Sequence, residues 1–131
     1  AVQFERMATG LTPETVAFGK WMMSGAHHYA GNFDLARRFG EAAPRLSIKA
    51  AGAVSSSAVQ LVQVPRVLWH QGYPDEASRQ AAADLRDPAI CDHAVSYAYA
   101  LTSAGCIAIW RGDDHAAREI TNEMLAFTQK H

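Results

Sequence analysis

The chain has 131 residues, of which 49% are hydrophobic and 19% charged, and its formal net charge is -1 with histidine counted as neutral. This composition is typical of a globular domain with a buried core and excludes an intrinsically disordered chain. The 12 lysines and arginines are scattered along the sequence, which argues against a nucleic-acid-binding stripe or a polybasic membrane patch. No apolar run approaches the roughly 20 residues that a membrane-spanning helix needs.

The first predicted helix opens at Thr12 and Pro13 and runs to about Tyr29. Threonine is a favoured N-cap residue, and proline fits the first helical turn because the amide it lacks would be unpaired there anyway. A remnant of an earlier helix is expected at residues 2–8. The chain begins at Ala1 without an initiator methionine, and we expect it to be a fragment of a longer protein.

A short pattern then occurs three times: an aromatic residue, any residue, glycine, four residues and alanine. Its copies are YAGNFDLA at residues 29–36, HQGYPDEA at residues 70–77 and WRGDDHAA at residues 110–117. The turn glycines are 41 and 40 residues apart, and internal periods of this size are typical of helical arrays. The pattern predicts three helical hairpins, at about 14–44, 53–85 and 88–130.

Each residue type in the pattern has a structural role. Glycine is expected to end one helix in the left-handed conformation, which costs it little. Aspartate near the start of the next helix is expected to cap amides and meet the positive end of the helix dipole. Alanine lets the two helices of a hairpin approach closely. In chain order, the residues concerned are Gly31, Asp34 and Ala36, then Gly72, Asp75 and Ala77, then Gly112, Asp113 or Asp114, and Ala117.

The remaining elements also read as helices. The second helix of the first hairpin is expected to end at residues 42–44, and Pro65 is expected to kink the apolar run 59–69 or to begin a helix there. Either Asp92 or the Asp87–Pro88 step is expected to open a helix that runs to about Trp110. In a last helix, 114–128, apolar residues at i, i+3 and i+7 spacing share one face: Ala117, Ile120, Met124 and Phe127. No convincing strand pattern is present, so the predicted fold class is all-α with six main helices.

These hairpins resemble the tetratricopeptide (TPR) family. In that family the first helix carries a small residue where it packs on the second. Ser24 and Gly105 fill that position here, seven residues before their turn glycines, whereas Pro65 departs from the pattern. The period also exceeds the 34 residues usual for the family. The resemblance implies a right-handed superhelical stack of about three hairpins.

The stretches VLWHQGYPDEASRQA and DHAVSYAYALTSAGCIAIWRGD are similar to the TPR-like arrays of large bacterial signal-transduction ATPases and transcriptional regulators. In those proteins a nucleotide-binding domain, and often a DNA-binding domain, lies elsewhere in the chain. By that resemblance, the first helix of each hairpin would line a concave groove. Its candidate positions are Trp21, His28, Tyr29, Val62, Arg66, Trp69, His70, Tyr99, Thr102, Ile109 and Trp110. The alternative is that these aromatics pack in the core or against neighbouring repeats.

Metal and catalytic sites are not indicated. His27 and His28 are adjacent and point about 100° apart on a helix, and no histidine pair has i, i+4 spacing. The serine run 55–57 lacks a nucleophile-elbow context, and Asp113 and Asp114 are better explained by helix capping than as a carboxylate pair. No cofactor is expected, because no glycine-rich phosphate-binding loop is present. Cys91 and Cys106 are expected to be reduced, buried thiols of a cytosolic protein.

The expected function is a non-catalytic protein–protein interaction or regulatory sensor domain of a bacterial transcriptional regulator or signalling protein in the cytoplasm. Its partner would be a protein, a peptide or other domains of the parent chain, without direct contact to nucleic acid or membrane. The alternative is a small-molecule sensor with the ligand held among Trp21, Trp69 and Trp110. Exposed apolar faces of helices 14–29 and 114–128 predict a homodimer.

Overall fold

A computed structural model describes residues 11–42 and 63–130, and throughout these two ranges the regular structure is helical, without strands. The helices, in chain order, are α2 (Pro13–Tyr29), α3 (Phe33–Glu41), α5 (Val64–His70), α6 (Pro74–Asp84), α7 (Pro88–Cys91), α8 (Ala94–Arg111) and α9 (Asp114–Thr128). None of them is long and apolar enough to cross a membrane. The expected helix at 2–8, the helix end at 43–44, the start of the second hairpin at 53, the serine run and Val62 lie outside the described residues.

The three turn glycines end their helices in the same way, as predicted. Gly31, Gly72 and Gly112 have φ angles of 77°, 86° and 72°, in the left-handed region. At the first turn, the Gly31 amide donates to the His28 carbonyl at 3.0 Å, and the Asn32 amide donates to the His27 carbonyl at 2.8 Å. The corresponding amides donate to the corresponding carbonyls at the other two turns. This pair of bonds is the Schellman motif, so all three hairpins turn through one backbone geometry.

The helix that follows each turn begins with less side-chain capping than expected. Asp113 is the N-cap of α9, and its carboxylate accepts a hydrogen bond from the Ala116 amide at 3.0 Å. The N-caps of α3 and α6 are Asn32 and Tyr73, and neither side chain forms a cap bond. Asp34 and Asp75 lie within the first turns of α3 and α6, where a carboxylate meets the helix dipole without capping an amide. The predicted cap is therefore confirmed only in the third hairpin.

Replacing Gly72 with alanine is expected to lower the free energy of unfolding by about 1 kcal/mol, because a side chain strains the left-handed backbone. A Cβ there would meet no atom within 4 Å, so the cost is conformational. Gly105 provides a control, because it lies inside α8 and its added Cβ would make an ordinary 3.6 Å contact with Ile120. Gly105→Ala should raise stability by up to about 1 kcal/mol. Urea unfolding of both variants measures the two signs, and equal effects would contradict this account.

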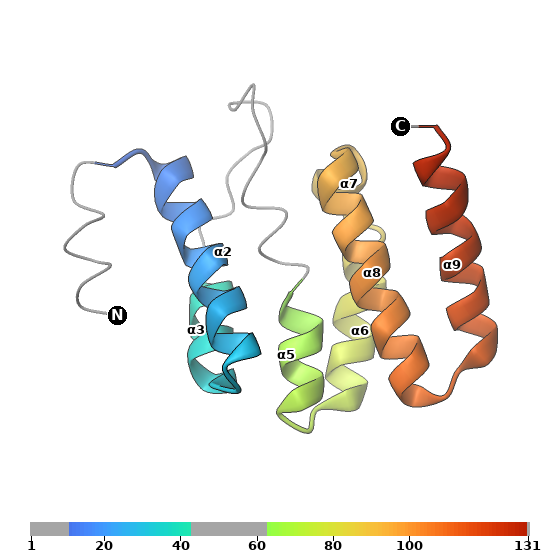
Figure 1. The fold of residues 1–131 in the computed structure, drawn as a ribbon, viewed down its shortest axis with the longest axis horizontal. Helices are drawn as coiled ribbons and strands as arrows, with labels where there is room; N and C mark the ends of the chain where they lie inside the picture. Colours follow the sequence, from blue (N-terminus) through green and yellow to red (C-terminus); the bar gives the residue numbers. More distant parts are fainter. Residues whose placement is uncertain (1–10, 43–62, 131) are drawn as a thin grey trace.

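The helices of each hairpin pack on one another: α2 on α3, α5 on α6 and α8 on α9. Neighbouring hairpins meet through α3 against α5 and through α8 against both α5 and α6. In Figure 1, α2, α5 and α8 follow one another in that order across the molecule. The first helices of the three hairpins thus succeed one another along one layer.

The three residues that lie seven positions before the turn glycines have different structural roles. Ser24 is buried and its hydroxyl donates to the Ala36 carbonyl at 2.8 Å, which ties α2 to α3. Gly105 faces Ile120 of α9. Pro65 lies buried in the first turn of α5, at a helix start as one of the two predictions had it, and residues 59–62 of the apolar run lie outside the described residues. Ala36 and Ala77 are fully buried, whereas Ala117 is only half-buried.

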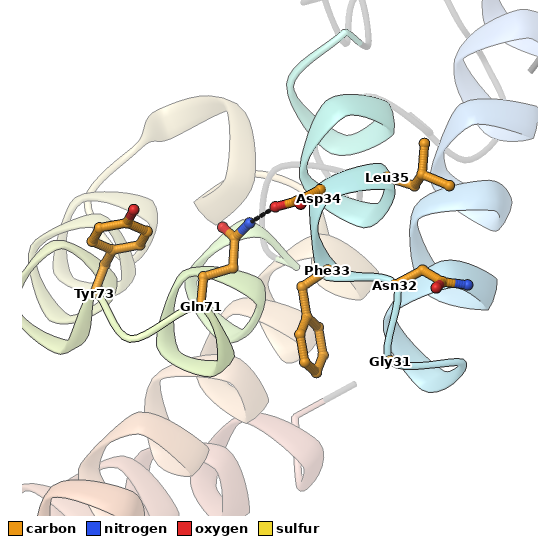
Figure 2. A pocket seen from close by; sticks show the side chains of 7 residues that line it. All are labelled: Gly31, Asn32, Phe33, Asp34, Leu35, Gln71 and Tyr73. Carbon is orange, nitrogen blue, oxygen red and sulfur yellow. Dashed lines mark hydrogen bonds between the residues drawn. The ribbon is translucent and has the colours of Figure 1, made fainter.

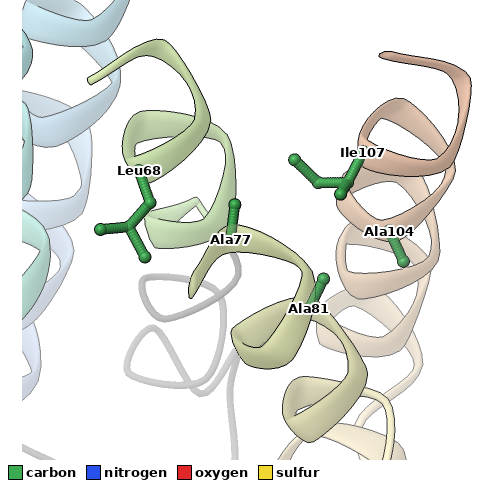
Figure 3. Packing of buried hydrophobic residues seen from close by; sticks show 5 residues of the cluster. All are labelled: Leu68, Ala77, Ala81, Ala104 and Ile107. Atoms are coloured by element: carbon green, nitrogen blue, oxygen red, sulfur yellow. The ribbon is translucent and has the colours of Figure 1, made fainter. Parts of the chain in front are cut away.

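The main hydrophobic cluster joins the second hairpin to the third. Figure 3 shows Leu68 of α5, Ala77 and Ala81 of α6, and Ala104 and Ile107 of α8 together. The three alanines let the α6 and α8 backbones approach, while the two larger side chains fill the remaining space. The predicted face of α9 is its less exposed side, but no α9 residue is fully buried, so this helix adds little to the core.

The region before α8 differs from the sequence prediction. Both proposed starts mark helix boundaries. Asp87 is the N-cap of the short helix α7, Asp92 is its C-cap, and a new helix, α8, begins at Ala94. Asp92 is not the cap of α8, because His93 Nδ1 accepts the hydrogen bond from the Ser96 amide at 3.2 Å. Cys91 and Cys106 are free cysteines, but the prediction that they are buried is wrong, since both are only half-buried. Partial burial raises the pKa of the Cys91 thiol, which donates to the Leu85 carbonyl.

One polar contact between hairpins is repeated. The contact joins the residue just before one turn glycine to an aspartate of the previous turn. That aspartate lies three residues after its own turn glycine. Gln71 donates to Asp34 at 2.8 Å (Figure 2), and Arg111 lies 3.6 Å from Asp75. At the two ends the equivalent positions hold Ala30, which has no polar side chain, and His115, which pairs with Glu119 of its own helix. These exposed contacts add less than about 1 kcal/mol each and serve mainly to set the register between hairpins.

Candidate binding groove

Aromatic side chains form a ladder across the first helices of the three hairpins. The ring centroids of His28 and His70 are 5.2 Å apart, those of His70 and Trp110 are 5.0 Å apart, and those of Trp69 and Trp110 are 5.8 Å apart. Tyr29 stacks on His28 at 5.4 Å. Because Tyr29, His70 and Trp110 each lie two residues before a turn glycine, the repeated turns bring them into one row.

The predicted groove residues divide into packed and exposed side chains. His28 is buried, and the half-buried Trp69 packs against the main hydrophobic cluster. Tyr29 is 80% exposed, and Tyr99 and Trp110 are 40% and 39% exposed. Other large apolar side chains exposed on α2 and α8 are Phe18, Met22, Val95 and Ile109. The same ladder therefore stabilises the hairpin stack on its inner side and presents apolar surface on its outer side.

A hollow of about 450 Å³ lies beside the ladder and is lined by all three first helices. Its lining residues are Trp21, Met22, Gly25, Ala26, Tyr29, Gln63, Arg66, Tyr99 and Thr102. The rings of Trp21 and Tyr99, from α2 and α8, meet edge to face with centroids 6.0 Å apart. The hollow brings together five of the predicted groove residues: Trp21, Tyr29, Arg66, Tyr99 and Thr102. The ladder holds His28, Trp69, His70 and Trp110, and Ile109 is exposed nearby on α8.

Two residues that line this hollow, Gln63 and Gly25, were not predicted from the sequence. Gln63 precedes Arg66 by three residues and Gly25 follows Trp21 by four, so helical spacing alone could have placed both on the groove side. A Cβ on Gly25 would lie 3.4 Å from Gln63 Oε1. The glycine therefore leaves room for the glutamine amide at the base of the hollow.

Three residues that line this hollow each have a buried polar atom with no hydrogen-bond partner within the part of the chain that the structure describes. The atoms are Trp21 Nε1, Gln63 Oε1 and Arg66 Nε. Arg66 also forms no ion pair with a described residue, and none of the lining residues is acidic. Buried polar groups are normally paired, so three unpaired ones among the residues that line one hollow are unusual. Two of these atoms, Trp21 Nε1 and Arg66 Nε, are donors and Gln63 Oε1 is an acceptor, while the Arg66 guanidinium gives the lining a positive charge.

The charge of Arg66 reaches His28 on the neighbouring helix. Burial, together with the nearby Arg66 charge and His70, lowers the pKa of His28 to about 4. His28 is therefore neutral at physiological pH, and its buried Nδ1 has no partner among the described residues. The positive charge of the groove is thus carried by Arg66 and not by His28.

Two other hollows are less suited to specific recognition. One, of about 500 Å³, lies at the first turn beside Gln71 and Tyr73 (Figure 2), and its carboxylate, Asp34, is already bound by Gln71. The other, of about 300 Å³, lies between α6, α8 and α9 and is lined largely by alanines. The groove beside the ladder combines apolar walls with residues of α2 and of the start of α5 whose buried polar atoms are unpaired.

Metal-binding clusters of three or more histidine, cysteine, aspartate or glutamate residues are absent from ranges 11–42 and 63–130. His27 stacks on Phe39 while His28 contacts His70, so the adjacent histidines face different neighbours. Asp113 is engaged in capping α9. Comparison of the chain with protein-family models, curated proteins and solved structures gave no match.

Proposed function

We propose that this chain is a non-catalytic recognition domain that binds a protein or peptide partner. The partner would bind the face of α2, α5 and α8 that carries the aromatic ladder and the hollow beside it, here called the outer face. The observation that carries the proposal is the aromatic ladder with the groove beside it. Tyrosine and tryptophan supply large contact areas with few rotatable bonds, and exposed apolar patches of this kind are typical of binding surfaces. Tyr29 and Trp110 are the expected anchors.

The repeated turns support placing the chain among TPR-like arrays. Three Schellman turns of the same geometry, each followed at the same spacing by an alanine, are what stacked hairpins of that kind require. By the resemblance in sequence, the domain would serve a bacterial transcriptional regulator or signalling protein in the cytoplasm. Its partner would be another protein or another domain of the parent chain, and a second copy could pair through the terminal helices. Binding across the hairpins would bias their packing and so signal to the attached domain.

Retention of the partner tests this proposal. Tyr29→Ser removes an anchor that is 80% exposed and should leave the fold intact while weakening partner retention about tenfold. Tyr73→Ser is the matched control, because Tyr73 is also exposed but lies at the turn between α5 and α6. Pull-down of partners by each variant, at matched circular dichroism, measures the difference. Equal losses in the two variants, or none, would contradict the proposal.

A second candidate is a small-molecule sensor. It is favoured by the hollow of about 450 Å³, which lies within the size range of ligand pockets and is lined by three residues with buried, unpaired polar atoms. In this alternative, the ligand would occupy the groove and change the packing of α5 between α2 and α8.

A further inference from the structure

The geometry points to a specific ligand chemistry for the hollow between α2, α5 and α8: a small organic carboxylate attached to an apolar or aromatic body. This inference rests on the proposed function in one respect, because it takes the outer face of these helices as the recognition surface. It goes further by naming the charge and the shape that the hollow selects.

The positive charge and the donors select an anion. Arg66 is half-buried, it has no acidic partner among the described residues, and its Nε–H is buried and unpaired. Trp21 contributes a second buried N–H without a partner from the opposite helix. A planar carboxylate suits both, because its two oxygens can accept from a guanidinium and from a further donor at once. No lining side chain would repel the negative charge.

The walls select an apolar body. Met22 and Ala26 of α2 and the rings of Tyr29 and Tyr99 supply apolar surface around the polar atoms. A hollow of about 450 Å³ accommodates one small molecule. The three polar atoms belong to side chains that line the hollow, and each atom is itself buried.

Gln63 and Thr102 add a hydrogen-bonding preference for the ligand. Gln63 is 6% exposed, lines the hollow and leaves its Oε1 unpaired, so it can accept from a hydroxyl or amide of the ligand. The Thr102 hydroxyl donates to the Ala98 carbonyl at 2.8 Å, which leaves its oxygen free to accept a further hydrogen bond. A carboxylate whose body carries a hydrogen-bond donor is therefore expected to bind more tightly than the plain hydrocarbon acid.

Calorimetric titration with a matched set of compounds tests this inference. The probes are 3-phenylpropionate, hexanoate and 2-hydroxy-3-phenylpropionate, with 3-phenylpropanamide as the neutral control and acetate as the control without a body. At least one of the three acids should saturate the protein in the low-millimolar range that suits ligands of this size. The neutral amide and acetate should bind at least about tenfold more weakly, because they lack the charge or the apolar body.

Two pairs of variants locate the site. Arg66→Gln should weaken binding of the acids about tenfold or more, whereas Arg79→Gln, an exposed arginine of α6 away from the hollow, should leave it unchanged. Trp21→Phe keeps a ring but removes the N–H, and should weaken binding about fivefold. Trp110→Phe alters the ladder without touching the hollow and should have no effect.

Each result decides the inference. Saturable binding that depends on charge, on Arg66 and on the Trp21 N–H would support it. No saturable binding of any of the three acids up to about 10 mM, or equal binding by the acid and its amide, would overturn it, as would binding unaffected by Arg66→Gln. A partner that is captured through Tyr29 while no acid binds would overturn this inference alone and leave the proposed function in place. Acid binding without Tyr29-dependent capture of a partner would overturn the proposed protein or peptide partner and leave this inference in place.

Discussion

Replacing Ile107 with alanine is expected to lower the free energy of unfolding by about 2–5 kcal/mol, the range usual for removing a buried Ile or Leu side chain. Ile107 is 3% exposed and packs in the cluster of Figure 3 that joins α5, α6 and α8. Three of the other four buried residues of this cluster are alanines, whose side chains are too short to fill the cavity. Since a domain of this size has only about 5–15 kcal/mol of stability, the loss should be visible as a clear fall in Tm.

Ile109→Ala is the matched control, because it makes the same chemical change two residues along the same helix. Ile109 is 66% exposed, so its variant should change stability by less than about 0.5 kcal/mol. Chemical unfolding followed by circular dichroism measures both. Similar losses for the two variants would mean that α8 does not present its Ile107 side to α6.

Acidification from pH 7 to pH 5 is expected to destabilise the fold through His28. In the folded chain the pKa of His28 is lowered to about 4, chiefly by burial and then by Arg66 and His70, whereas in the unfolded chain it is near 6.5. Between these values the unfolded state binds the additional proton, so stability falls as the pH falls. The contribution is complete above about pH 6.5 and is lost by at most about 1.4 kcal/mol per pH unit down to about pH 4.

The control for this prediction is an exposed histidine. His28→Asn should flatten the dependence of unfolding free energy on pH, whereas His115→Asn should not, because His115 lies exposed at the start of α9. If the His28 variant fails to fold, an NMR titration of the wild-type imidazoles answers the question directly. A His28 resonance that titrates near pH 6.5 would contradict the lowered pKa.

The local signals in the sequence were sufficient for the turns. Gly31, Gly72 and Gly112 could be predicted because a left-handed backbone favours glycine, and the structure places all three there. Thr12 and Pro13 marked the start of α2 for equally local reasons. The cap of α8 could not be predicted in this way, since a histidine at that position competes with a neighbouring aspartate and the choice depends on how α7 packs.

The candidate groove was predicted less completely. The resemblance to TPR arrays placed Trp21, Arg66 and Tyr99 in a common groove, but it could not show that the rings of Trp21 and Tyr99 meet, because that contact depends on the spacing of the helices. It also could not distinguish His28, which is buried, from its exposed neighbour Tyr29. Gln63 was missed although its spacing from Arg66 is helical, because its role depends on the space that Gly25 leaves for it.

The outer face of α2, α5 and α8 as a recognition surface is tested most directly by site-specific photo-crosslinking in cells that make the protein. A benzophenone amino acid replaces Tyr29 on this face, or Leu125 on the exposed side of α9 as a control that is also more than half exposed. The account predicts a discrete crosslinked adduct from position 29 that weakens when Trp110 is changed to serine, and none from position 125. Adducts from position 125 alone, or none from position 29, would contradict it.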